Sequence, residues 1–145
     1  MIPDFDGNGL LPKGIHIATL AEFEGRFAKT AWRVKFFPYL LDLIRDLRRV
    51  GVTGIYVDGG YTTNKRIPSD MDICWDDTNI DYNYIKSEMP ILFDLDFPRL
   101  SQQAVYKSDI FPAHFIETSS GLYFIDFFQK DKYTNLPKGI IKIEI

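Results

Sequence analysis

The chain has 145 residues, of which 46% are hydrophobic and 15% aromatic, so it is long enough to bury a core of its own. Its 17 Lys and Arg against 20 Asp and Glu give a net charge of -3, which argues against general nucleic-acid coating. A single cysteine excludes an intrachain disulfide, and no apolar run approaches the length of a membrane span. Because a signal-peptide pattern is also missing, we expect one soluble, cytoplasmic domain over residues 1–145, with no membrane contact.

The first third of the chain is predicted as a loop followed by two helices. Proline and glycine break any period in residues 2–14, and we expect residues 1–18 to form an N-terminal loop segment. Thr19 and Glu22 match a capping box, which predicts a short helix at about 20–28. A longer helix that stops near Gly51 is predicted from apolar residues at helical spacing. These are Phe36, Leu40, Ile44 and Leu47.

The rest of the chain is predicted as strands with helical pieces between them. Strands are predicted at about 53–58, 70–75, 108–116, 121–128 and 139–145. Residues 76–103 are expected to be helical in pieces, because Pro90 and Pro98 interrupt them. This order of elements indicates an α+β fold with a mixed β-sheet flanked by helices.

The segment with the most chemistry lies around two glycines and two acids. Gly59 and Gly60 follow a predicted strand, where they let the backbone turn sharply and approach a phosphate closely. Asp70 and Asp72 are two apart on the next predicted strand, so they point to the same face. Two such carboxylates repel each other unless a cation lies between them, and Mg²⁺ binds carboxylates together with phosphate oxygens. The pattern predicts a site for a nucleoside triphosphate and a divalent metal.

These residues resemble the DNA polymerase beta-like nucleotidyltransferase superfamily, in its minimal nucleotidyltransferase form. Its signature is Gly-Gly or Gly-Ser after a strand and an acid-apolar-acid triplet on the next strand, here Asp70-Met71-Asp72. The chain also resembles a small bacterial and phage family of nucleotidyltransferase-like proteins over nearly its whole length. The stretches that carry this second resemblance are residues 2–12, 14–16, 18–23, 70–76, 125–129 and 138–145.

The superfamily resemblance implies two Mg²⁺ ions, with Mn²⁺ as a substitute, and transfer of a nucleotidyl group from a nucleoside triphosphate. It implies metal ligands at Asp70 and Asp72 and a phosphate cradle at Gly59 and Gly60. Many active members carry serine at the position of Gly60, so this chain keeps the backbone amide there and lacks the hydroxyl.

The resemblance also implies a third carboxylate on a later strand, which helps to hold metal and readies the acceptor hydroxyl. Asp109 directly follows the helical stretch, and we favour it slightly as that catalytic and metal-binding residue. Asp126 lies among apolar residues in the strand predicted at 121–128, where a carboxylate is costly unless paired or metal-bound. Both stay candidates.

The loop between the two halves of the motif supplies the remaining nucleotide-binding candidates, which are Thr62, Lys65 and Arg66. The two basic residues are equally well explained as a solvated loop. Cys74 alternates with Asp72 on one strand face and either lines the site or is a buried inert thiol, which we favour. The two histidines lack zinc spacing, so no zinc site is expected.

Three functions remain in view from the sequence. The first is a Mg²⁺-dependent nucleotidyltransferase that modifies a protein or RNA acceptor, such as a cognate toxin in a toxin–antitoxin or phage-defence setting. The second is a binding module, an antitoxin or interaction subunit, that keeps the fold with little catalysis. The third and weakest is a nucleotide sensor without turnover.

Overall fold

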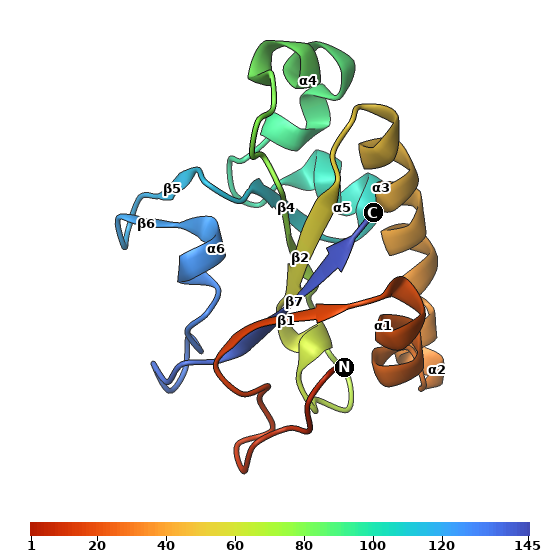
Figure 1. Ribbon diagram of the computed structural model, residues 1–145, viewed down its shortest axis with the longest axis vertical. Coiled ribbons are helices and arrows are strands. Elements are labelled where there is room, and N and C mark those ends of the chain that lie inside the picture. Colours follow the sequence, from red (N-terminus) through yellow and green to blue (C-terminus); the bar gives the residue numbers. More distant parts are fainter.

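A five-stranded mixed sheet forms the centre of the computed structural model, which describes residues 1–145 (Figure 1). In the order of the sheet, its strands are β1 (Gly14–Ala18), β7 (Gly139–Glu144), β2 (Gly54–Asp58), β3 (Asp72–Trp75) and β4 (Asp109–Pro112). The two outer pairs, β1 with β7 and β3 with β4, are parallel, whereas β2 runs antiparallel to both of its neighbours. The α+β class with a mixed sheet is therefore confirmed.

Six α-helices and two 3-10 turns connect the strands. The helices are α1 (Leu20–Phe27), α2 (Ala31–Val34), α3 (Phe37–Arg49), α4 (Tyr82–Glu88), α5 (Leu100–Tyr106) and α6 (Phe124–Phe127). The 3-10 turns are η1 (Gly60–Thr62) and η2 (Pro90–Phe93). A small hairpin of β5 (Ile116–Glu117) and β6 (Leu122–Tyr123) lies outside the main sheet.

The first helices follow the local signals of their sequence. The Thr19 side chain accepts a hydrogen bond from the backbone N–H of Glu22, and the Glu22 side chain accepts one from the backbone N–H of Thr19, so the capping box starts α1 as predicted. In α3, Pro38 lies in the first turn, where a missing N–H costs nothing. The apolar stripe of α3 is buried against the sheet, and Gly51 follows the helix with a positive φ of 90°.

The two faces of the sheet are covered unequally. Helices α1 to α3 pack on one side, while α6 and the small hairpin lie on the other (Figure 1). The helical face holds the main core of 24 buried residues, and the opposite face holds a cluster of six. Cys74 belongs to the smaller cluster and is buried, and burial raises the pKa of its thiol well above the usual range. It lines neither of the cavities described below.

Several of the predicted boundaries are wrong. Residues 14–18 form strand β1 instead of loop, because they pair with β7 from the far end of the chain. Asp70 precedes β3, which begins only at Asp72. The strand predicted at 121–128 is instead β6 followed by one turn of α6, which places Phe124 and Phe128 against Phe111. The strand predicted at 108–116 ends at Pro112.

The helices of this fold are short. None of them combines the length and the apolar character that a membrane span requires.

Candidate functional site

Three carboxylates stand side by side at one edge of the sheet. Asp58 is the last residue of β2, and Asp72 and Asp109 are the first residues of β3 and β4. The strand register places Asp72 directly opposite Asp58 on one side and Asp109 on the other. Because neighbouring strands lie about 5 Å apart, the backbone alone forces these three acids into one row. We call them the carboxylate row.

The glycine turn begins where the row begins. Gly59 has φ 84° and ψ -169°, a conformation that essentially only glycine adopts, and a Cβ there would meet backbone atoms of residues 70 and 72 at 3.1 and 3.0 Å. Gly60 has no such φ, but its amide N–H donates to Asp70 Oδ1 at 3.0 Å. The Asp70 carboxylate thus accepts the hydrogen bond from the Gly60 amide that we expected a phosphate oxygen to accept.

Burial strongly affects the acid–base behaviour of the row. It raises the pKa of Asp58 to about 6, although the Lys138 ammonium lies 3.0 Å from Asp58 Oδ1. It raises the pKa of Asp72 to about 8, and the charges of the carboxylates around it, those of Asp58, Asp70 and Asp109, add to the effect. This edge therefore holds more negative charge than the protein itself compensates.

At the other end of the row, Asp109 is held by two partners from the start of α5. Arg99 Nη2 lies 3.1 Å from one carboxylate oxygen, and Gln103 Nε2 donates to the other at 2.8 Å. Arg99 just precedes α5, so its ion pair with Asp109 links this helix to the first residue of β4 at the end of the row. Asp109 is thereby fixed in orientation beside Asp72.

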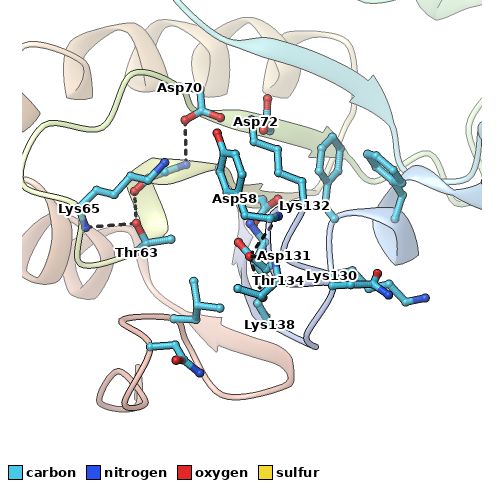
Figure 2. Close-up of a pocket in the computed structure, with 18 of the residues that line it drawn as sticks. Asp58, Thr63, Lys65, Asp70, Asp72, Lys130, Asp131, Lys132, Thr134 and Lys138 are labelled. Carbon is cyan, nitrogen blue, oxygen red and sulfur yellow. Dashed lines mark hydrogen bonds and ion pairs between the residues drawn. The ribbon is translucent and has the colours of Figure 1, made fainter.

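A cavity of about 470 Å³ lies on the glycine side of the row (Figure 2). Its wall contains the glycine turn, Asp58, Asp70 and Asp72, and residues 8–10 from the N-terminal segment line part of it. Four lysines line the same cavity, and they are Lys65, Lys130, Lys132 and Lys138. Such a cluster of ammonium groups suits a polyanionic ligand.

The loop from Lys130 to Lys138 carries three of these lysines and has a defined shape. An isolated β-bridge joins Lys130 to Pro137, and Asp131 accepts hydrogen bonds from the Tyr133 and Thr134 backbone. The Lys132 ammonium lies 5.1 Å from the centre of the Tyr133 ring, and the Lys65 ammonium lies 5.5 Å from it. Cation–π contacts thus gather Lys65 and Lys132 around one ring at the cavity.

A buried arginine anchors the loop that follows the glycine turn. Arg33 of α2 is 6% exposed, and its guanidinium donates to the carbonyls of Tyr61, Thr63 and Lys65 at 2.6 to 2.8 Å. The carbonyls of a surface loop are normally hydrogen-bonded to water. Here the Arg33 guanidinium binds three of them instead, so it fixes the position of the loop. The clamp holds Thr63 and Lys65 at the cavity wall.

A second cavity of about 760 Å³ lies on the other side of the row. It shares Asp70, Asp72, Phe127, Phe128 and Lys132 with the first cavity, and its own wall includes Asp109 and Arg99. Most of the remaining wall is aromatic. The carboxylate row therefore stands between a cavity lined by four lysines and four aspartates and a cavity that is largely aromatic.

The predicted site residues are brought together in part. Asp70, Asp72, Asp109, Gly59, Gly60 and Lys65 all lie at this edge. Asp126 lies in α6, is exposed and lines neither cavity, so the structure separates it from the row. Arg66 is exposed and also lines neither cavity. Thr62 is buried with its hydroxyl on Gly59 O, and its neighbour Thr63 reaches the wall instead.

Sequence reasoning missed several residues of the site. Asp58 was passed over because a single acid at the end of an apolar strand carries no motif, yet its position just before two glycines was a usable signal. The lysines at 130, 132 and 138 were missed because they lie far from the glycine turn in sequence. The one signal in the local sequence was the close spacing of these lysines just before the strand predicted at 139–145.

The donor chemistry of the row fits a hard divalent cation such as Mg²⁺. All candidate ligands are carboxylate oxygens, and the raised pKa of Asp72 shows that a further positive charge there would be stabilised. In this structure no three acidic, histidine or cysteine side chains already converge on one point. Asp58 and Asp109 are turned instead toward Lys138 and Arg99, so metal binding requires these side chains to rotate.

Comparison with known proteins gives a family and no function. No curated protein and no solved structure matches the chain. A family model described as a family of unknown function (DUF6932) matches residues 3–144. Because this match covers nearly the whole chain, the protein belongs to the DUF6932 family.

Proposed function

We propose that the protein is a metal-dependent nucleotidyltransferase of the nucleotidyltransferase-like fold, acting in the cytoplasm on a macromolecular acceptor. The observation that carries the proposal is the carboxylate row between two cavities, with a glycine turn and four lysines on one side of it. The glycine turn with its Asp70-Met71-Asp72 triplet has the spacing of the superfamily signature.

In this proposal the first cavity binds the triphosphate. Lys65, Lys130 and Lys132 neutralise its phosphates, and a phosphate oxygen replaces Asp70 on the Gly60 amide. Asp70, once released, joins Asp72 and Asp109 as a ligand for Mg²⁺ or Mn²⁺. The bound cation would neutralise charge on the reacting phosphate and align the two oxygens involved.

The proposed transfer needs only the groups that the site and its two substrates supply. The acceptor hydroxyl oxygen forms a bond to the α-phosphorus, the bond from that phosphorus to the bridging oxygen breaks, and pyrophosphate leaves with the electron pair. The hydroxyl proton passes to a carboxylate of the row. Asp109 suits this role because it faces the second cavity, where the acceptor arrives.

Two assays test the proposal. A thermal-shift series with each nucleoside triphosphate, with and without Mg²⁺ or Mn²⁺, should raise the melting temperature only when both ligands are present. Transfer of label from α-³²P nucleotides to protein or RNA in a lysate of the source cells should then identify the acceptor class. The absence of any shift with either metal would overturn nucleotide binding, for the enzyme and for a sensor alike.

Asp126 provides a matched control for the row, because it is an aspartate outside both cavities. Asp72→Asn and Asp109→Asn should each lower transfer by orders of magnitude, and Asp109→Asn should retain triphosphate binding better. Asp126→Asn should leave transfer unchanged. Equal loss in all three variants would mean that the label is not transferred at this site.

The second candidate is a binding module with the same fold and little catalysis, such as an antitoxin. It is favoured by one observation: Lys138 and Arg99 already pair with the two outer acids of the row. If the wild type labels nothing, yet binds or neutralises a partner as well as Asp72→Asn does, the binding module is the function.

A further inference from the structure

The second cavity has a composition unlike that of the first. Six phenylalanines line it, at positions 97, 111, 115, 124, 127 and 128. Three of them pack on one another, since the rings of Phe111 and Phe124 are 4.2 Å apart and those of Phe111 and Phe128 are 5.4 Å apart. Phe97 is 84% exposed at the rim, so part of this aromatic surface faces solvent. An aromatic group can stack here at little cost in ordering.

The charge of the same wall selects among possible ligands. Five acids line the cavity, and they are Asp70, Asp72, Asp96, Asp109 and Glu117. Arg99 and Lys132 are the two basic residues on it. Arg99 is already paired with Asp109, so the wall keeps a clear excess of negative charge. A nucleic-acid strand would bring its phosphates against these carboxylates, whereas a positively charged protein segment is attracted.

We propose that the second cavity is the acceptor subsite and that it binds an aromatic side chain on a lysine- or arginine-rich segment of a partner protein. The phenylalanines receive the ring, and the acids at the rim receive the flanking cations. The acceptor role rests on the proposed nucleotidyl transfer. If that transfer occurs, the charge of this cavity favours a protein over RNA as the acceptor.

Binding of short synthetic peptides tests the inference by calorimetry on the whole protein. The first peptide is rich in lysine with one central phenylalanine, the second has serine in place of phenylalanine, and the third has glutamate in place of lysine. We expect the first to bind about tenfold or more tightly than either of the others, and its affinity to fall with added salt. Equal binding of the first two peptides would overturn the aromatic subsite. Tighter binding of a short single-stranded RNA than of the first peptide would overturn the protein acceptor.

Two pairs of variants locate the bound peptide. Ile116→Ser changes a half-exposed residue of the cavity, and Ile17→Ser changes a similarly exposed one on β1 outside it. Asp96→Lys reverses a charge at the cavity, and Glu24→Lys reverses one on α1. The cavity variants should weaken the first peptide severalfold, and their controls should not. The same loss in the controls would place the peptide elsewhere and overturn the inference.

The triphosphate thermal shift separates this inference from the proposed function, because neither cavity variant touches the first cavity. A triphosphate shift without peptide binding overturns the acceptor subsite alone. Peptide binding at the cavity without any triphosphate shift overturns nucleotidyl transfer, and with it the acceptor role, while the aromatic binding site stands.

Discussion

Asp72 is the residue whose environment has the largest consequence for stability. Burial and the neighbouring carboxylates raise its pKa from about 4 to about 8, so the folded protein holds this proton more tightly than the unfolded chain does. A raised pKa of this kind favours folding at low pH, and the contribution is lost as the pH rises from about 4 to about 8. The ligand-free protein therefore carries an electrostatic cost at the pH of the cell.

Asp72→Asn should remove that cost, because an amide keeps the shape and cannot ionise. At pH 8 without metal we expect a gain of at least about 1 kcal/mol in the free energy of unfolding, which is the value of one pKa unit. Urea unfolding at several pH values measures it, and the variant should lose less stability than the wild type between pH 5 and pH 8. If the two proteins show parallel pH profiles, Asp72 titrates normally and the row is more solvated than its burial indicates.

The two glycines of the turn should respond differently to substitution. Gly59→Ala forces an unfavourable backbone conformation and brings a Cβ against backbone atoms, so we expect a loss of about 1–3 kcal/mol in stability. Gly60→Val meets mainly side chains, with Asp70 Oδ1 at 2.8 Å nearest, and should keep the fold while abolishing the triphosphate thermal shift. Of the two glycines, Gly59 holds the positive φ of the turn and Gly60 does not. If triphosphate binding survives in Gly60→Val, the glycine pair serves only to turn the backbone.

At the scale of elements, Arg33 makes three of the hydrogen bonds that link α2 to the glycine loop. Arg33→Met removes the donor for three carbonyls of the loop, and we expect a loss of about 2–4 kcal/mol in the free energy of unfolding. Arg33→Lys keeps the charge without the planar fork and should fall in between. Denaturant unfolding measures all three proteins, with Arg66→Met as the control because Arg66 is exposed. Losses of equal size in both methionine variants would mean that the clamp adds nothing.

Elements with strong local signals could be predicted from the sequence, and elements made by distant contacts could not. The capping box of α1, the apolar stripe of α3 and the alternation in β7 each mark their own segment. Strand β1 depends on β7, which follows it by more than a hundred residues, and no local pattern reports such a partner. The candidate site divides in the same way: Asp70 and Asp72 lie in a motif, whereas Asp58 and Lys138 meet only through the register of β2 and β7.

The whole molecule has a thick side and a thin side. Helices α1 and α3 bury most of the core on one face, while the opposite face is covered by a four-residue helix and a hairpin of two-residue strands. Both cavities take part of their wall from the thin side. Local opening of a protein is easiest where few apolar contacts must be broken.

Hydrogen exchange followed by mass spectrometry should show this asymmetry. We expect amides of residues 114–138 to exchange before those of β2, β3 and β7, and to slow when triphosphate and Mg²⁺ are bound together. The N-terminal residues 1–7, of which Met1, Asp4, Asp6 and Gly7 are exposed, serve as the reference for rapid exchange. Equal protection of residues 114–138 and of the central strands would show that the thin side opens only when the whole domain unfolds.

The position of β7 in the sheet also bears on how the protein matures during its synthesis. β7 pairs with both β1 and β2, and Gly139 aligns with Gly14, 125 positions earlier in the chain. On the ribosome, β1 therefore waits without a partner strand until nearly every other element has been made. Asp58 likewise has no Lys138 beside it until then. A nascent chain thus lacks both the complete sheet and the last wall of the first cavity until translation has passed β7.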